Sequence, residues 1–184
     1  FEKSFRLFTE GYKLPKNVQA SVRGSRCGEL VARCIVEIGT SSYYTAIGDA
    51  AGEPVLEAIC RKIAADEFRH YKLFYTYLKR YLEREKIGRW ERLKVALSRR
   101  AESEDDELSY AYYAAHYDGR PYDHIRCRDR YLAQALGFYR REHIARMTAM
   151  MLKAVGLSAH PYLQRASEWL GWNILRQKAW RVGA

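Results

Sequence analysis

A glutamate and a histidine three residues apart, Glu67 and His70, are the side chains of this sequence best suited to bind a metal ion. They lie in a segment with helical periodicity, where a spacing of three places both side chains on one face, about a turn apart. Glu37 lies one short hairpin upstream in a segment with a similar apolar stripe. Folding the two segments back to back brings Glu37 toward Glu67, so we expect the three side chains to meet.

Both carboxylates interrupt otherwise apolar stripes, and the sequence therefore predicts that they are buried. An unpaired buried carboxylate is strongly destabilising, so a cation must neutralise it. A bound divalent or trivalent metal ion would do so. The alternatives are an ion pair with Arg33, Arg61 or Arg69, or positions at the solvated edge of the helices. The stripe through Glu67 and His70 contains Leu56, Ile59, Ile63, Phe74 and Tyr77, and the stripe through Glu37 contains Leu30, Cys34, Ser41, Tyr44 and Gly48.

The elements that must position these residues are predicted to be helices throughout, so the fold class is all-α. Only four prolines and twelve glycines occur, and they cluster between long stretches of helical periodicity. A basic connection over residues 86–100 is expected to be helical in part. The expected helices cover residues 22–50, 54–85, 102–117, 122–155 and 160–181.

The lengths of the connections predict how the first four helices are arranged. Short turns join the first to the second and the third to the fourth, whereas the connection between these pairs is longer. Two antiparallel hairpins joined by a crossover make a ferritin-like four-helix bundle, expected over residues 22–156 of a single domain spanning residues 1–184. Such bundles hold two metal ions, using one Glu from each of two helices and Glu-x-x-His from each of the others.

The second hairpin offers a less complete set of ligands. Glu107 is the best candidate on the third helix, and Glu104 is the second candidate. On the fourth helix, Glu142 is followed three residues later by Ala145 instead of histidine, and His143 lies next to Glu142. Apolar periodicity supports an inward position for either Glu142 or His143, so the sequence leaves both open as metal ligands.

Residues 63–70, which read Ile-Ala-Ala-Asp-Glu-Phe-Arg-His, resemble a segment of the soluble acyl carrier protein desaturases. The helix pair over residues 36–78 is similar in layout to theirs, and more broadly to the ferritin-like di-iron superfamily, which includes rubrerythrins and ferritins. The resemblance implies two iron ions, with Glu67 bridging them, His70 as a terminal ligand and Glu37 as a terminal or bridging ligand. It also implies a homodimer that pairs through the first two helices.

Composition limits the compartment and the partners. The chain has 184 residues, 48% of them hydrophobic, with no run of apolar residues long enough for a transmembrane segment. Its four cysteines form no Cys-x-x-Cys pair, which favours reduced thiols in a cytoplasmic protein. The net charge is +10, and lysines and arginines crowd residues 79–100. This surface suits an acidic carrier protein or a tRNA, and a solvated basic face is the alternative.

Two classes of function are open at this point. The first is a non-haem di-iron oxidoreductase of the desaturase, hydroxylase or ferroxidase type, with manganese or zinc as substitutes for iron. The second is a ferritin-like bundle with an incomplete site, acting as a metal-binding or interaction protein without turnover. The Glu37, Glu67 and His70 set favours the first class, and Ala145 favours the second.

Overall fold

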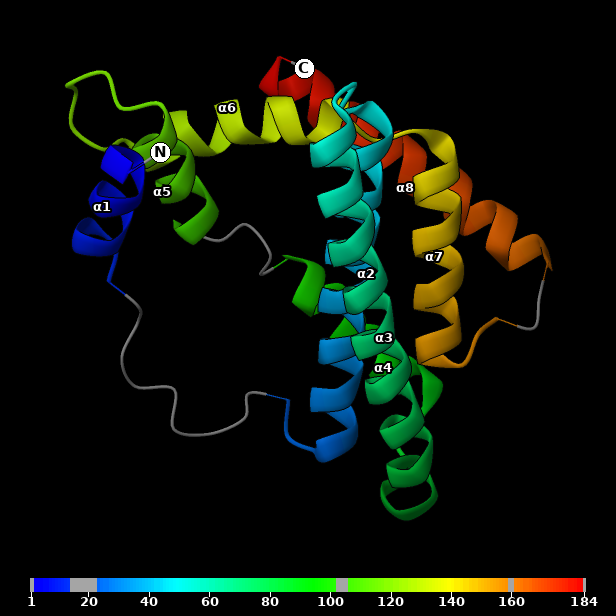
Figure 1. Ribbon diagram of the computed structural model, residues 1–184. Helices are drawn as coiled ribbons and strands as arrows, with labels where there is room; N and C mark the ends of the chain where they lie inside the picture. Colours follow the sequence, from blue (N-terminus) through cyan, green and yellow to red (C-terminus); the bar gives the residue numbers. More distant parts are fainter. Residues whose placement is uncertain (1, 14–22, 102–105, 159–160, 184) are drawn as a thin grey trace.

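The computed structural model describes residues 2–13, 23–101, 106–158 and 161–183, with the backbone alone for residues 100, 101 and 106 (Figure 1). Every regular element in these residues is an α-helix, which confirms the all-α class. None of these helices combines the length and apolar character needed to cross a membrane. The helices are α1 (Glu2–Gly11), α2 (Arg26–Ala50), α3 (Pro54–Glu85), α4 (Arg89–Ala101), α5 (Asp106–Ala115), α6 (His124–Gly137), α7 (Arg141–Val155) and α8 (Pro161–Val182).

Capping interactions fix where the two helices of the α2–α3 hairpin begin. α2 starts after Ser25, whose hydroxyl accepts a hydrogen bond from the N–H of Gly28 at 2.9 Å. α3 starts after Glu53, whose carboxylate accepts hydrogen bonds from the N–H groups of Val55 and Leu56 at 2.9 and 2.7 Å. Because the connection between the helices is short, α2 and α3 run antiparallel along each other.

Close contacts between the two helices set their register. A Cβ added at Gly48 would lie 3.2 Å from a side-chain carbon of α3, so a larger residue there would push the helices apart. The buried hydroxyl of Ser41 donates a hydrogen bond to the carbonyl oxygen of Ala64 at 2.9 Å. Moving one further turn back along α2 from Ser41 reaches Glu37, and moving one turn forward along α3 from Ala64 reaches Glu67. The hairpin register therefore places the two carboxylates opposite each other.

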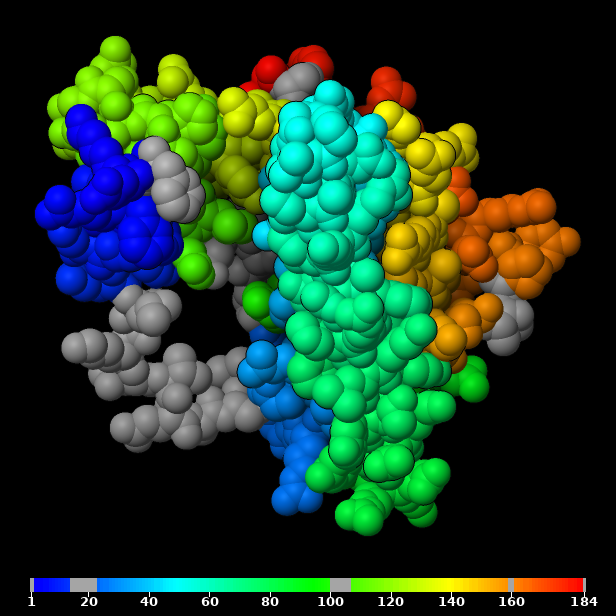
Figure 2. Space-filling view, in the orientation of Figure 1, coloured from blue at the N-terminus to red at the C-terminus, as the bar shows by residue number. Residues whose placement is uncertain are grey.

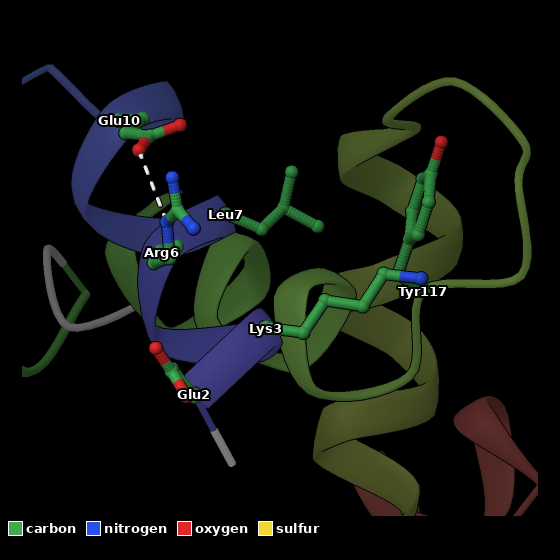
Figure 3. A pocket seen from close by; sticks show the side chains of 6 residues that line it. All are labelled: Glu2, Lys3, Arg6, Leu7, Glu10 and Tyr117. Carbon is green, nitrogen blue, oxygen red and sulfur yellow. Dashed lines mark ion pairs between the residues drawn. The ribbon is translucent and has the colours of Figure 1, made fainter.

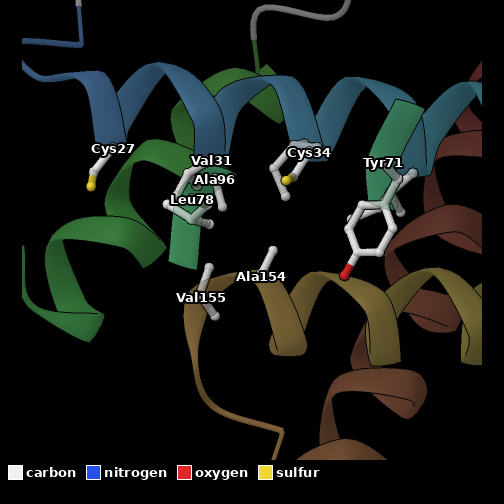
Figure 4. Close-up of a cluster of buried hydrophobic side chains, with 10 residues drawn as sticks. Cys27, Val31, Cys34, Tyr71, Leu78, Ala96, Ala154 and Val155 are labelled. Carbon is white, nitrogen blue, oxygen red and sulfur yellow. The ribbon is translucent and has the colours of Figure 1, made fainter. Parts of the chain in front are cut away.

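The hydrophobic core lies where α2 meets α3, α4 and α7 (Figure 4). Full burial of one large aliphatic side chain contributes roughly 1.5–3 kcal/mol, so this cluster is the main force that holds the hairpin against its neighbours. The four cysteines are buried free thiols, in agreement with the sequence prediction. The buried cluster contains Cys27, Val31, Cys34, Ile35 and Ile38 of α2, Tyr71 and Leu78 of α3, Ala96 of α4, and Ala154 and Val155 of α7.

The third helix lies elsewhere than the sequence predicted. Residues 102–117 were expected to pack beside the first two helices, but the helix found there, α5, packs against α1 and α6. An aromatic cluster explains its position, because the ring of Tyr110 lies 6.2 Å from that of Phe8 and 5.9 Å from that of Tyr12. The helix that packs against α2 and α7 is α4, which forms most of the basic connection.

The fourth helix was expected to be continuous over residues 122–155, and this prediction was wrong. α6 ends at Gly137 and α7 begins at Arg141. Between them, Arg140 has an extended backbone with φ −107° and ψ 166°, and its N–H donates to Nδ1 of His143 at 2.9 Å. This side-chain bond replaces the intrahelical bond that a continuous helix would make there, so the chain starts a new helix.

Several apolar side chains of the α3 stripe that was expected to be buried are exposed to solvent. Leu56, Ile59 and Tyr77 are 42%, 49% and 43% exposed. The reason is that α7 lies along the other flank of α3, where its side chains contact the rings of Phe68 and Tyr75. One flank of α3 is therefore covered within the chain, and the flank carrying the stripe is not.

Candidate metal site

Glu37, Glu67 and His70 come together near the middle of the α2–α3 hairpin. Each offers a ligand atom, and these atoms lie within 4.8 Å of one another. Nδ1 of His70 lies 3.3 Å from Oε2 of Glu67 and 3.6 Å from Oε2 of Glu37. The exposed side-chain fraction rises from 11% for Glu37 through 23% for Glu67 to 55% for His70. The cluster is thus closed on the α2 side and opens to the surface at His70.

Below about pH 7, the pKa of Glu37 favours a proton shared between the two carboxyl groups. Burial, and then the hydrogen bond and negative charge of Glu67, raise the pKa of Glu37 to about 7, whereas His70 acts in the opposite direction. The same hydrogen bond is the main cause that lowers the pKa of Glu67. Protonated Glu37 therefore donates to ionised Glu67, and a cation that binds both must displace this proton.

The alternative of neutralisation by arginine does not match the geometry. His70 is the sole basic side chain within ion-pair distance of Glu37 or Glu67 among the described residues. The three arginines considered from the sequence are engaged elsewhere or point outward. Arg61 pairs with Glu57 and Asp49, Arg69 pairs with Asp66, and Arg33 is exposed without an ion pair to a described carboxylate.

The distances within the cluster fit a metal ion. Oxygen and nitrogen ligands lie about 2.0–2.2 Å from zinc, so neighbouring ligands around a tetrahedral ion are about 3.4 Å apart. The two measured separations from Nδ1 of His70, 3.3 and 3.6 Å, bracket that value. Burial raises the pKa of nearby Cys34 to about 12, with the charge of Glu37 adding to the effect, so this thiol stays protonated. Two carboxylates and one imidazole suit iron, manganese or zinc.

A second cluster of Asp49, Glu142 and His143 meets the same distance criterion. Nδ1 of His143 accepts a hydrogen bond from the N–H of Arg140, so the ring proton lies on Nε2, which donates to Oδ2 of Asp49 at 3.0 Å. Both ring nitrogens are therefore in use, and the buried imidazole links the end of α2 to the start of α7. His143 faces inward and Glu142 outward, which answers the choice that periodicity had left open.

The remaining sequence-predicted ligands do not reach the Glu37 cluster. Glu107 lies exposed on α5, whose neighbours are α1 and α6, and Glu104 lies outside the described residues. Glu142 and His143 belong to the second cluster at the far end of α2. Within the described residues, a single copy of the chain therefore brings together three of the six side chains expected to bind metal.

Two polar residues near these clusters were missed from the sequence. Thr40 forms a side-chain hydrogen bond that helps to lower the pKa of Glu67. Its position three residues after Glu37 is a signal that helical spacing could have supplied. Asp49, the partner of His143, has no such signal, because the two residues lie 94 positions apart in the sequence.

A hollow beside α1 is a different surface feature with no comparable chemistry (Figure 3). Three of its charged side chains interact with their own neighbours. Arg6 pairs with Glu10 at 3.6 Å, and Nζ of Lys3 lies 5.8 Å from the ring centre of Tyr117. Among the described residues, no histidine or cysteine lines the hollow, so the Glu37 cluster is the stronger candidate site.

Comparisons of the chain with protein-family models, with curated proteins and with solved structures found no match. The interpretation of the site therefore depends on its own geometry. That geometry consists of a buried carboxylate pair on adjacent helices with an imidazole at its open side.

Proposed function

We propose that this chain binds iron, or manganese or zinc in its place, through Glu37, Glu67 and His70, and that the metal serves oxygen-dependent oxidation of the desaturase, hydroxylase or ferroxidase type. The observation that carries the proposal is the approach of His70 Nδ1 to both carboxylates, within 3.6 Å, at a place no arginine or lysine of the described residues reaches. The resemblance of residues 63–70 to the acyl carrier protein desaturases supports the same class.

Each side chain has a definable task at such a site. Glu37, on the buried side, would hold the ion against α2, and loss of its shared proton would give the pair the charge that a divalent cation needs. His70 lies at the open side, where its Nδ1 would hold the ion and leave access from the surface. Bound iron would supply the one-electron chemistry that dioxygen requires.

A metal-binding or interaction protein without turnover is the second candidate. The observation that favours it is the ligand count, because Glu107 lies on α5 and both ring nitrogens of His143 are occupied. Three protein ligands hold an ion but do not by themselves make the six-residue set of ferritin-like di-iron bundles.

Four cations on the seam between α3 and α7 support an anionic carrier, either an acyl carrier protein or a tRNA, as the partner that presents the substrate. Two of the cations contact the half-buried ring of Phe68 and the other two contact that of Tyr75, and these cation–π contacts hold the charges in place. None of the four pairs with a carboxylate in the described part of the chain, so their charge is available to a polyanion. Lys72 and Arg146 lie 4.5 and 5.5 Å from the ring centre of Phe68, and Lys79 and Lys153 each lie 5.4 Å from that of Tyr75.

The carrier proposal is tested by neutralising two of these cations. Changing Lys79→Gln and Lys153→Gln together should weaken binding of acyl carrier protein or tRNA and flatten its salt dependence. Lys62→Gln, an exposed lysine of α3 outside the seam, is the matched control. Affinity and salt slope equal to those of the control would remove the seam from the proposal.

The metal proposal is tested by elemental analysis of protein purified from iron-supplemented growth. The unchanged protein should bind iron, and Glu67→Ala should lose it. Glu57→Ala is the matched control and should still bind iron, because Glu57 pairs with Arg61 on the same helix. Absence of metal from all three proteins would overturn the proposal. The rate at which added ferrous iron is oxidised then separates the two candidates. A site with turnover should oxidise it faster than Glu67→Ala does, whereas a site without turnover should not.

A further inference from the structure

The metal cluster opens onto an apolar flank of α3, which we call the open face. It comprises Leu56, Ile59, Leu73 and Tyr77 together with His70, and the four apolar residues are 42%, 49%, 51% and 43% exposed. Steps of three, eleven, three and four residues keep these side chains on one side of the helix. Figure 2 shows α3 in front of the other described helices, with none of them lying across it in this view. The open face thus combines four exposed apolar side chains with the metal cluster and with exposed Asp66, which pairs with Arg69.

The cluster is incomplete on that side in two respects. Three ligand atoms leave coordination positions of an iron or manganese ion to be filled, since such ions take up to six oxygen or nitrogen donors. In addition, Nε2 of His70 has no hydrogen-bond partner among the described residues. A metal-bound histidine almost always donates its second ring N–H to a carboxylate, a carbonyl or water. His70, the most exposed of the three side chains at 55%, lies on the open face.

We infer that a second copy of this chain docks on the open face, related by a two-fold axis beside Glu67 and His70, and that the two clusters form one dinuclear metal site. The inference rests on the proposed metal-binding function. Each copy supplies Glu37 from α2 and the Glu-x-x-His motif from α3, giving four carboxylates and two imidazoles in total. This is the donor set that ferritin-like dimetal bundles assemble from four helices of one chain. Here the four helices are two copies of α2 and α3.

The position of the cluster suits this symmetry. In an isologous dimer only residues near the axis meet their own counterparts in the partner. Glu37 lies near the middle of α2 (Arg26–Ala50), and Glu67 and His70 lie near the middle of α3 (Pro54–Glu85). An axis through the cluster therefore lets the whole of both helices overlap. Charge also balances, because four ionised carboxylates match two divalent cations.

The size of the face predicts how the dimer depends on metal. Residues 56–77 span roughly 32 Å of helix at 1.5 Å per residue, and two adjacent helices are roughly 20 Å wide, which gives roughly 600 Å² per copy. A standard stable interface buries about 800 Å² per partner, so apolar burial alone gives a weak dimer. Shared metal ions should strengthen it.

The test combines sedimentation velocity with electron paramagnetic resonance of protein loaded with Mn²⁺. We expect manganese to shift the protein from monomer toward dimer and to give the spectrum of a spin-coupled pair, with one ion per chain. Ile59→Asp, which places a charge on the open face, should return the protein to monomers with isolated-ion spectra. Leu97→Asp is the matched control, because Leu97 is 53% exposed on α4, away from the open face.

Each other outcome is decisive. Monomers with one isolated Mn²⁺ per chain at all concentrations would overturn the shared site and leave the metal-binding proposal standing. A dimer whose ions show no spin coupling, or one that Ile59→Asp leaves intact, would also overturn the shared site. Absence of bound metal would overturn both proposals.

Discussion

Lowering the pH through about 7 should weaken metal binding, because the ion competes with the proton that Glu37 shares with Glu67. Burial beside Glu67 raises the pKa of Glu37 from 4.5 to about 7, so the carboxyl is mostly protonated below this pH and mostly ionised above it. With a pKa of about 7, binding should release from Glu37 about 0.9 proton at pH 6, about 0.5 at pH 7 and about 0.1 at pH 8. The contribution to affinity is a loss of about tenfold from pH 8 to pH 6.

Titration calorimetry with zinc, in pairs of buffers that differ in ionisation enthalpy, counts the released protons directly. The same titration of Glu37→Gln removes the contribution of Glu37. Glu57→Gln removes a carboxylate of α3 that lies outside the cluster, so it is the control and should behave like the unchanged protein. A difference between the unchanged protein and Glu37→Gln that is equal at pH 6 and pH 8 would refute the reasoning.

Three further predictions concern stability. Because the pKa of Glu37 is raised on folding, its contribution to the free energy of unfolding falls as pH rises from 4.5 to about 7. Metal-free Glu37→Gln should therefore gain in Tm relative to the unchanged protein between pH 5 and pH 8. A difference in Tm that stays constant over this range would contradict the prediction. Leu78→Ala removes a fully buried side chain and should cost about 2–5 kcal/mol in urea unfolding, whereas exposed Leu97→Ala should change it by less than about 0.5 kcal/mol. His143→Ala breaks the link between α2 and α7 and should cost about 1–3 kcal/mol without changing metal stoichiometry, and a loss of bound metal greater than that of exposed Glu142→Ala would show that His143 is a ligand.

Local pattern was sufficient to predict the hairpin that carries the candidate site. Residues 54–85, expected as one helix from periodicity, are the residues of α3, and the proline and glutamate at its start are its capping signals. The approach of Glu37 to Glu67 follows from the short connection, since a hairpin fixes which residues face each other. These predictions depend on interactions within a few turns of helix, which a sequence displays directly.

The rest depends on contacts between distant segments. The break between α6 and α7 is stabilised by His143, whose partners are a backbone N–H three residues away and Asp49, 94 positions earlier in the sequence. The place of α5 depends on the ring of Tyr110 meeting aromatic rings of α1. The open face of α3 could not be predicted for the same reason. An apolar stripe predicts that a helix face is buried, but it does not identify the element that packs on it.

X-ray absorption spectroscopy of the zinc-loaded protein tests the central claim most directly. Coordination by Glu37, Glu67 and His70 predicts a first shell of oxygen and nitrogen alone at about 2.0–2.2 Å, together with imidazole scattering, and Glu67→Gln should lose this signal. A sulfur shell at about 2.3 Å would assign the metal to the buried cysteines instead. A spectrum unchanged in Glu67→Gln would equally contradict a metal site between α2 and α3.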